Sequence, residues 1–347
     1  MVEFYRDEYR ATVEKAKRMQ GFSYLFITDM HIDYRDSAAG VLRQCETAVS
    51  LADEVGADCI VLGGDIVHGC SSHDATIDWF RRYAEIFASA HCPTFVARGN
   101  HDENPYHSRG EKNKTVPPEY LITPAEWCAE LLDRESLTRG MLVHDRADPL
   151  SAYYTVDMPG RQTRLIFLDP FDHPADVSDG YMTWVSESWN RVSAQQMRWF
   201  AAALGAIPDG WRCLLFCHGA VYRLNEAPFI NAADVRALLA AFNGKRTCTL
   251  DAYGIEADYR QTKTRIPLCH FGHTHVDGSG IDPESGILYL NTGHAKTKPD
   301  YVNNGGVTRV DGTVSEALFD LVVCTDEGTV ERIRFGAGVD ESFVLPL

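Results

Sequence analysis

Apolar runs and amphipathic segments alternate along the first third of the chain. Apolar residues within 4–20 recur at steps of three and four, which predicts an amphipathic helix packed on the body of the protein. Beyond it, short apolar runs typical of buried strands alternate with helical patterns. The strands are expected at 22–27, 59–62 and 94–97, and the helices at 38–55 and 75–90. This order predicts parallel strands joined by helices.

Strand-like runs dominate the second half of the sequence. They lie at 153–156, 165–168, 213–216, 268–271, 287–290, 318–323 and 330–335, with helical patterns near 124–132, 194–204 and 232–242. No segment rich in Pro, Gly or Ser separates the halves, so we expect one domain over residues 1–347. Within it, residues 1–20 would form the N-terminal helix, and 315–347 would form C-terminal strands packed on the core.

The composition is ordinary for a soluble enzyme, with 45% hydrophobic and 24% charged residues. No run approaches the ~18 uninterrupted apolar residues of a membrane span, and the charged N-terminus has no apolar signal region. We therefore expect a soluble, cytoplasmic protein. The ten cysteines include no Cys-x-x-Cys pair, which favours reduced core thiols over disulfides or zinc ligands.

The formal net charge of −16 bears on the substrate. Nucleic-acid affinity rests mainly on Lys and Arg, so an acidic chain makes a nucleic-acid substrate less favoured without excluding it. Bound cations would reverse the charge locally if some of the acidic residues are metal ligands.

Five short polar blocks follow apolar runs at the ends of expected strands. They are Asp29-Met30-His31, Gly64-Asp65, Gly99-Asn100-His101-Asp102, Cys217-His218-Gly219 and Gly272-His273-Thr274-His275. Three of them follow the parallel strands, whose carboxyl ends form a crevice where sites occur. Residues i and i+2 of an extended segment project to one side. Asp29 and His31 are therefore expected to bind one ion together, and His273 and His275 to face the same cavity.

These residue types predict a site for two metal ions. Mixed Asp, Asn and His ligation suits Mn²⁺, Fe or Zn²⁺. Asp65 on a sharp turn can bridge two ions about 3.5–4 Å apart, while Asn100 offers a carbonyl oxygen and His218 a nitrogen. Two such ions lower the pKa of a bridging water and attract a phosphate group. The blocks therefore indicate hydrolysis of a phosphate ester.

In order and content, the five blocks resemble the signature of the calcineurin-like metallophosphoesterase superfamily, over about residues 22–295. The resemblance implies an α/β fold, a four-layer α/β/β/α sandwich of two mixed β-sheets flanked by helices. It implies that Asp29, His31 and His275 bind the first metal, that Asn100, His218 and His273 bind the second, and that Asp65 bridges them. One departure is Ala220, where many members have proline two residues after the ligand histidine.

The resemblance also implies two residues that assist catalysis without binding metal. His101 would protonate the departing oxygen or stabilise charge on the phosphoryl group, and Asp102 could orient it. The expected reaction is direct attack of metal-activated hydroxide on a phosphodiester or small phosphomonoester, with two divalent ions, Mn²⁺ foremost, and no membrane partner. Nothing in the sequence indicates an oligomeric state. Loops 103–122, 220–230 and 251–265 are expected to select the substrate, and the polar segment 103–118 is expected to be exposed near the site.

Two alternatives stay open at this stage. A DNA-processing nuclease of the same superfamily would need a basic groove, and the chain has no basic tract. A binding protein on this fold would usually have lost ligands, whereas all seven positions are present. The remaining histidines are expected to be structural or exposed, with His294 the best candidate to face substrate. They are His68, His73, His91, His107, His144, His173, His270 and His294. Arg98 is expected either to contact phosphate or to form a surface salt bridge.

Overall fold

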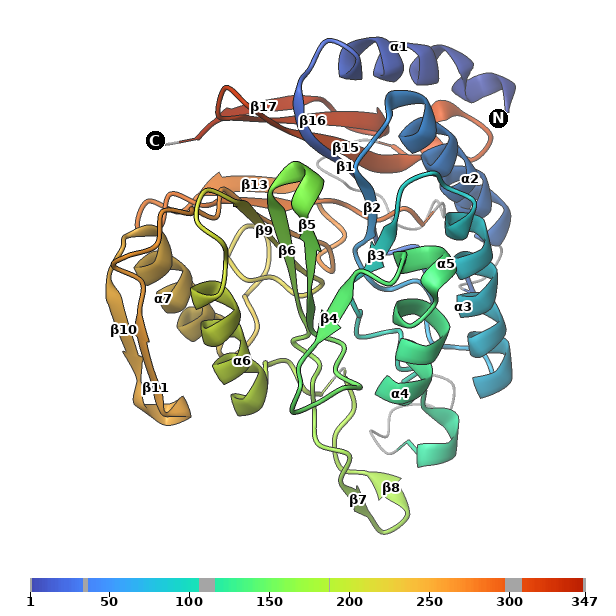
Figure 1. Ribbon diagram of the computed structural model, residues 1–347. Helices are drawn as coiled ribbons and strands as arrows, with labels where there is room; N and C mark the ends of the chain where they lie inside the picture. Colours follow the sequence, from blue (N-terminus) through green and yellow to red (C-terminus); the bar gives the residue numbers. More distant parts are fainter. Residues whose placement is uncertain (1, 34–36, 106–115, 187, 297–307, 346–347) are drawn as a thin grey trace.

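The structure is a computed structural model that describes residues 2–33, 37–105, 116–186, 188–296 and 308–345 (Figure 1). Most of the exposed loop expected at 103–118 lies outside these ranges. Within them, no helix has the length and apolar character that crossing a membrane requires.

The first sheet has six strands in the order β17-β16-β15-β1-β2-β3 (Figure 1). Its parallel strands are β1 (Gly21–Ile27), β2 (Cys59–Leu62) and β3 (Thr94–Val96), connected by α2 (Ala38–Val55) and α3 (His73–Ala88). Its antiparallel strands are β15 (Leu318–Thr325), β16 (Thr329–Gly336) and β17 (Glu341–Val344). The predicted parallel order of the first three strands is therefore confirmed.

The second sheet has seven strands in the order β13-β14-β12-β9-β6-β5-β4. Its parallel strands are β6 (Thr163–Leu168), β9 (Arg212–Cys217), β12 (Leu268–Phe271) and β14 (Leu288–Asn291). Its antiparallel strands are β4 (Leu142–His144), β5 (Tyr154–Met158) and β13 (Gly278–Ile281). The connections between parallel strands contain α6 (Ala194–Gly205) and α7 (Ala232–Asn243).

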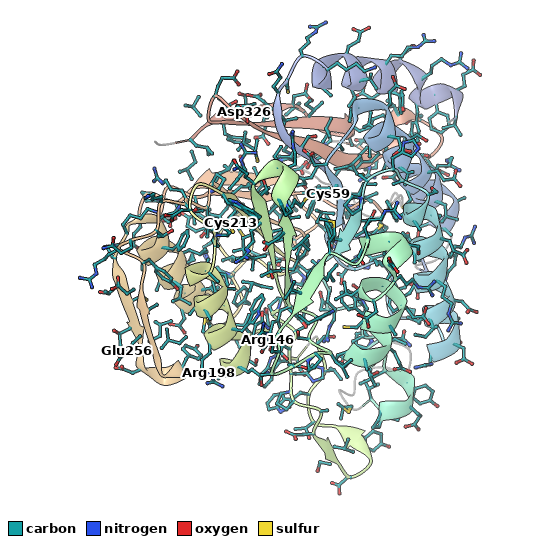
Figure 2. All side chains as sticks on the ribbon, in the orientation of Figure 1. Cys59, Arg146, Arg198, Cys213, Glu256 and Asp326 are labelled. Carbon is teal, nitrogen blue, oxygen red and sulfur yellow. The ribbon has the colours of Figure 1, made fainter. Side chains whose placement is uncertain are left out.

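The two sheets pack face to face through aromatic side chains. The ring centroid of Phe216 on β9 lies 5.2 Å from that of Tyr24 and 6.4 Å from that of Phe26, both on β1. Inner-face residues of both sheets share one hydrophobic cluster with α2 and α3, and a second cluster joins the second sheet to α6 and α7. The predicted α/β fold with two mixed sheets and flanking helices is confirmed. Cys59 and Cys213 lie on strands and are buried, whereas Arg198 and Glu256 lie at the outside (Figure 2).

Three local expectations differ from the structure. The first helix is shorter than 4–20: a 3₁₀ turn, η1 (Glu3–Tyr5), precedes α1 (Arg6–Ala16). The expected helix 124–132 begins as α4 (Pro124–Trp127) and widens into the π-helical turn η3 (Cys128–Leu132). The expected loop 251–265 contains β11 (Ile255–Asp258), which pairs with β10 (Thr247–Leu250). The sequence did not indicate this hairpin because β11 is only partly buried, and strands are recognised in a sequence by their apolar residues.

The remaining elements are short. They are η2 (Pro118–Tyr120), α5 (Glu135–Thr138), η4 (Pro159–Arg161), β7 (Val177–Ser178), β8 (Tyr181–Met182), η5 (Asp251–Tyr253) and η6 (Val314–Glu316). The β7–β8 hairpin projects from the lower end of the molecule (Figure 1).

Candidate metal centre

All five polar blocks lie just beyond the carboxyl ends of parallel strands. Three follow β1, β2 and β3 of the first sheet, and two follow β9 and β12 of the second. The sequence placed only three blocks at such ends, because the parallel arrangement of the second sheet was not evident from its apolar runs. Since the two sheets pack face to face, five strand ends converge on one crevice.

Six of the predicted ligands form two groups that share Asp65. The candidate ligand atoms of Asp29, His31, Asp65 and His275 lie within 4.8 Å of one another, as do those of Asp65, His218 and His273. In the first group, His275 Nε2 lies 3.2 Å from Asp29 Oδ1 and 3.0 Å from His31 Nε2. In the second, His218 Nε2 lies 3.1 Å from Asp65 Oδ2.

The buried polar atoms of this crevice test whether metal ions fit it. Four of them have no hydrogen-bond partner among the described residues: Asp29 Oδ1, Asp65 Oδ2, Asn100 Oδ1 and His218 Nε2. Buried polar atoms are nearly always satisfied, since an unsatisfied one costs about 1–3 kcal/mol and a charged one more. Oxygen and imidazole nitrogen atoms left over in this way are the donors that divalent cations take. The residues present therefore fit a metal centre.

The other atoms of the same side chains are bonded to the protein. Asp29 Oδ2 accepts from Thr28 Oγ1 at 2.7 Å and from the amide of His273 at 3.0 Å. Asp65 Oδ1 accepts from the amide of His101 at 2.9 Å. His218 Nδ1 lies 2.7 Å from the carbonyl of Gly63; because a carbonyl only accepts, Nδ1 carries a proton. Each side chain is thus oriented by one atom and presents the other to the crevice.

The backbone at the candidate ligands is left-handed rather than extended. Five of them have positive φ angles: Asp29 (53°), His31 (44°), Asp65 (52°), His273 (70°) and His275 (59°). The expectation that i and i+2 converge because the segments are extended is therefore wrong, although the pairs do meet. The strands end earlier, and the chain turns so that both side chains face inward. Such conformations cost of order 1–3 kcal/mol each and concentrate at functional sites.

Two glycines allow the blocks to approach each other. A Cβ atom at Gly99 would lie 2.1 Å from Asp65 Oδ1, and one at Gly272 would lie 2.5 Å from Asp29 Oδ2. Any side chain at these positions would push a candidate ligand out of place.

The carboxylates of the crevice favour a proton on His218. Burial lowers the pKa of His218, but Asp65 and Asp29 outweigh it and raise that pKa to about 10. Burial also raises the pKa of Asp65, but the charges of His218 and His101 hold it well below its usual value. Burial and the neighbouring His218 lower the pKa of His273 to about 4. A ring nitrogen binds metal only when it carries no proton. Cation binding here therefore requires release of the proton on Nε2 of His218.

His101 lies at the edge of the crevice, and Asp102 lies behind it. His101 Nε2 is 3.8 Å from Asp65 Oδ2, and its Nδ1 is 2.8 Å from the carbonyl of His68. The carboxylate of Asp102 is fully buried and accepts from the amides of Asp65 (3.1 Å), Ile66 (2.8 Å) and Gly99 (2.9 Å). Asp102 therefore fixes the turn that carries Asp65, because its side chain points back at backbone amides. That it also orients His101 stays a prediction.

The structure also revises three expectations about neighbouring residues. His68 contacts His31 and His101, so it belongs to the crevice rather than to the structural or exposed histidines. His294 is buried, with its ring centroid 5.3 Å from that of His275. Arg98 is buried rather than at the surface; it donates to the carbonyl of Phe171 at 2.8 Å and lies 3.5 Å from Asp169.

Phe171 forms an apolar wall that the sequence did not indicate. Its ring centroid lies 5.9 Å from that of His218 and 6.1 Å from that of His273. It follows β6, whose carboxyl end lies beside that of β9, and this position was the only signal of its role.

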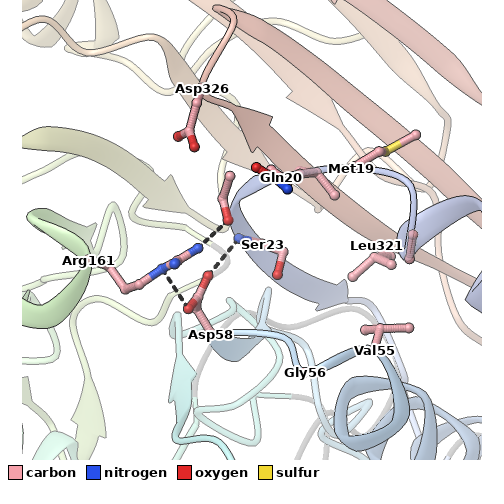
Figure 3. A pocket seen from close by; sticks show the side chains of 12 residues that line it. Met19, Gln20, Ser23, Val55, Gly56, Asp58, Arg161, Leu321 and Asp326 are labelled. Atoms are coloured by element: carbon pink, nitrogen blue, oxygen red, sulfur yellow. Dashed lines mark hydrogen bonds and ion pairs between the residues drawn. The ribbon is translucent and has the colours of Figure 1, made fainter.

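A separate cavity of about 360 Å³ lies near the start of β1, away from the candidate centre (Figure 3). Its main polar groups are already paired. Arg161 Nε lies 2.9 Å from Asp58 Oδ1, and Asp58 Oδ2 accepts from the amide of Ser23 at 2.9 Å. These contacts link β1 to the β5–β6 turn and leave no donor set for a metal ion.

The sequence model of calcineurin-like phosphoesterases matches residues 22–277. The chain belongs to this family. The matched range contains all seven predicted ligand positions and the two residues expected to assist catalysis, His101 and Asp102. Curated protein sequences give no match.

Solved structures of similar fold accord with this family. A dimetal phosphatase from Danio rerio is 16% identical, with a TM-score of 0.59 over 94% of this chain and 99% of that one. The purple acid phosphatase PPD1 from yellow lupin (Lupinus luteus) is 11% identical, with a TM-score of 0.54 over 94% of this chain and 54% of that one. At these identities the similarity shows the shared fold.

Proposed function

We propose that the protein is a phosphoesterase that uses two divalent metal ions to hydrolyse a phosphodiester or a small phosphomonoester. The observation that carries the proposal is the set of orphaned buried atoms around Asp65, two carboxylate oxygens, an amide oxygen and an imidazole nitrogen, in a chain of the calcineurin-like phosphoesterase family. A structural role would leave such atoms hydrogen-bonded.

The proposed ligand sets follow the two groups. Asp29, His31 and His275 would hold one ion, Asn100, His218 and His273 the other, and Asp65 both. Support comes from the clustering of six of these side chains and from the orphaned Oδ1 of Asn100. Mn²⁺ is the proposed metal, and Fe and Zn²⁺ also suit a set of nitrogen and oxygen donors without thiolates.

The ions would supply positive charge for the phosphoryl oxygens and make hydroxide available near neutral pH for attack on phosphorus. The chain supplies the remaining chemistry. His101 Nδ1 is bound to a carbonyl, so Nε2 is the ring atom that can deliver a proton to the departing oxygen. Its side chain is partly exposed, which gives a leaving group access.

The two alternatives have less support. A nuclease must attract the phosphate backbone, and the net charge of −16 opposes this. A binding protein would not need seven retained ligand positions, four of which carry buried atoms without a hydrogen-bond partner among the described residues. A cytoplasmic location completes the proposal. Cys59 and Cys213 are buried free thiols, as expected for core cysteines in a reducing compartment.

The test is metal analysis followed by a substrate panel. We expect close to two transition-metal ions per chain and hydrolysis of members of a panel of cyclic nucleotides, phosphodiesters and phosphomonoesters with Mn²⁺ present. Single-stranded and duplex DNA serve as the nuclease arm, with a chelated sample as control. Absence of bound metal under metal-replete conditions would refute the proposal, and DNA cleavage in preference to small esters would favour the nuclease.

A further inference from the structure

The ring of His68 contacts two imidazoles of the candidate centre. Its Nδ1 lies 3.3 Å from Nδ1 of His31. Its ring stacks on that of His101 with centroids 4.8 Å apart and planes 29° apart. Ring nitrogens of the three histidines lie within 4.8 Å of one another, yet the proposed ligand sets give His68 no role.

The contact between the two Nδ1 atoms fixes proton positions. A hydrogen bond between two neutral imidazoles needs one donor and one acceptor. In the proposed function, on which this step rests, His31 binds a cation through Nε2. Its Nδ1 then carries the proton and donates it to Nδ1 of His68. His68 in turn carries its own proton on Nε2.

The position of His68 is set by Asp33. One carboxylate oxygen of Asp33 accepts from the amide of His68. The other accepts from the amide of Cys70 at 3.1 Å and from Ser71 Oγ at 2.9 Å. A single carboxylate therefore fixes the whole turn, and the ring of His68 is directed by the backbone that carries it.

The main chain of His68 makes a second contact with the centre. Its carbonyl accepts from Nδ1–H of His101 at 2.8 Å, which leaves Nε2 of His101 facing Asp65. One residue thus touches a candidate ligand through its side chain and the candidate acid through its backbone.

We propose that His68 is a positioning residue that holds His31 in its metal-binding tautomer and ties that ligand to His101. Metal-binding histidines usually donate their second N–H to a carboxylate or a carbonyl, which orients the ring and raises its basicity. A neutral imidazole in that place does the same without adding a negative charge beside Asp29 and Asp65. The positive charge of the ions stays available for an anionic phosphate ester.

The test compares two substitutions that differ in one atom type at the contact. His68→Asn keeps an acceptor, because the amide oxygen occupies roughly the place of Nδ1, whereas His68→Leu removes it. His91→Leu is the matched control, because the side chain of His91 is 86% exposed. Metal-free forms are titrated with Mn²⁺ by calorimetry, and their melting temperatures are recorded beforehand to verify folding.

We expect His68→Leu to weaken the binding of one Mn²⁺ ion by about 10- to 100-fold, with His68→Asn and His91→Leu close to the wild type. In the Zn²⁺-loaded wild type, ¹⁵N NMR of the imidazoles should find the His68 proton on Nε2. This second measurement needs no variant, so it decides the matter if His68→Leu fails to fold.

The outcomes separate the inference from the proposed function. Two ions bound by the wild type and equally well by His68→Leu would overturn the role of His68 alone. A His68 proton on Nδ1 in the loaded protein would do the same. A wild type that binds no Mn²⁺ would refute the proposed function and, with it, the role of His68.

Discussion

Nε2 of His218 and Oδ2 of Asp65 lie 3.1 Å apart, fully buried, at the meeting point of the two sheets. Each comes from a different sheet, and the two atoms face each other as an ion pair without a well-aligned hydrogen bond. Their proximity makes Asp65 the side chain on which both halves of the proposed centre depend.

Asp65→Asn should therefore abolish the dinuclear centre. The neutral amide removes the charge shared by both ions, so we expect metal binding to weaken by more than about 100-fold, beyond the loss seen when supporting residues are changed. Elemental analysis after dialysis measures the metal content. Asp326→Asn, at a largely exposed side chain, is the control. Two retained ions in Asp65→Asn would contradict the bridging role.

Metal binding should stabilise the fold. A ligand that binds only the native state at 100 times its dissociation constant adds about 2.7 kcal/mol to the free energy of unfolding. We expect Mn²⁺ to raise the melting temperature of the wild type and a chelator to reverse the rise. Asp65→Asn should show no rise. An equal response of both proteins would assign the effect to other sites.

His101→Ala should slow turnover without removing metal. Loss of a proton donor lowers the rate about 10²–10⁴-fold when the leaving group is poor. The rate should fall much less for nitrophenolate, which departs without a proton. Rates on an alkyl and a nitrophenyl phosphodiester measure the contrast, and elemental analysis checks the metal. An equal loss on both esters would argue against proton donation by His101.

Asp102→Ala should destabilise the protein itself. The substitution leaves the amides of Asp65, Ile66 and Gly99 without their buried acceptor. Burial and the charge of Asp65 raise the pKa of Asp102 to about 7, so the measurement is made at roughly pH 8, where hydrogen bonds to the charged carboxylate contribute about 1.5–3 kcal/mol. We expect urea unfolding there to show a loss of about 3 kcal/mol. If stability stayed at the wild-type level while His101 chemistry failed, Asp102 would act through His101 after all.

Glu316 should make a pH-dependent contribution to the free energy of unfolding. Burial raises its pKa, but Arg43, the Gly312 amide and Tyr5 outweigh it and hold the pKa below the usual 4.5. A carboxyl with a lowered folded-state pKa stabilises above its unfolded pKa, and this contribution is lost as pH falls through the folded value. Glu316→Gln should thus destabilise at pH 7, and its difference from wild type should shrink below about pH 4.5. Urea unfolding across this range measures it; a constant difference would refute the linkage.

The sequence predicted the fold and the convergence of the blocks for a physical reason. Apolar runs mark strands, and parallel strands bring their carboxyl ends to one edge. Asp29, Asp65 and His218 each followed such a run, so their meeting could be expected. That Asn100 and the six clustered residues bind metal stays a prediction.

The remaining features of the site depend on contacts that the spacing of residues along the sequence does not reveal. Asp102 bonds backbone amides of the turn after β2, and His68 meets His31 across two loops. The left-handed backbone at Asp29 and His273 is not indicated by the apolar pattern of the strands that precede them. The rule that residues i and i+2 of an extended segment project to one side therefore predicted that these side chains meet, although the segments are not extended. Local sequence indicates where a strand ends but not how the chain turns beyond it.

The division of the crevice between two sheets also sets an order of events in biosynthesis. Chains emerge from the ribosome N-terminus first. Asp29, His31, Asp65 and Asn100 follow strands of the first sheet, and His218, His273 and His275 follow β9 and β12 of the second, so these histidines are synthesised later. A nascent chain halted before β9 would hold both carboxylates but lack three of the four imidazoles. The full donor set of the proposed centre therefore exists only once the chain has been made past β12.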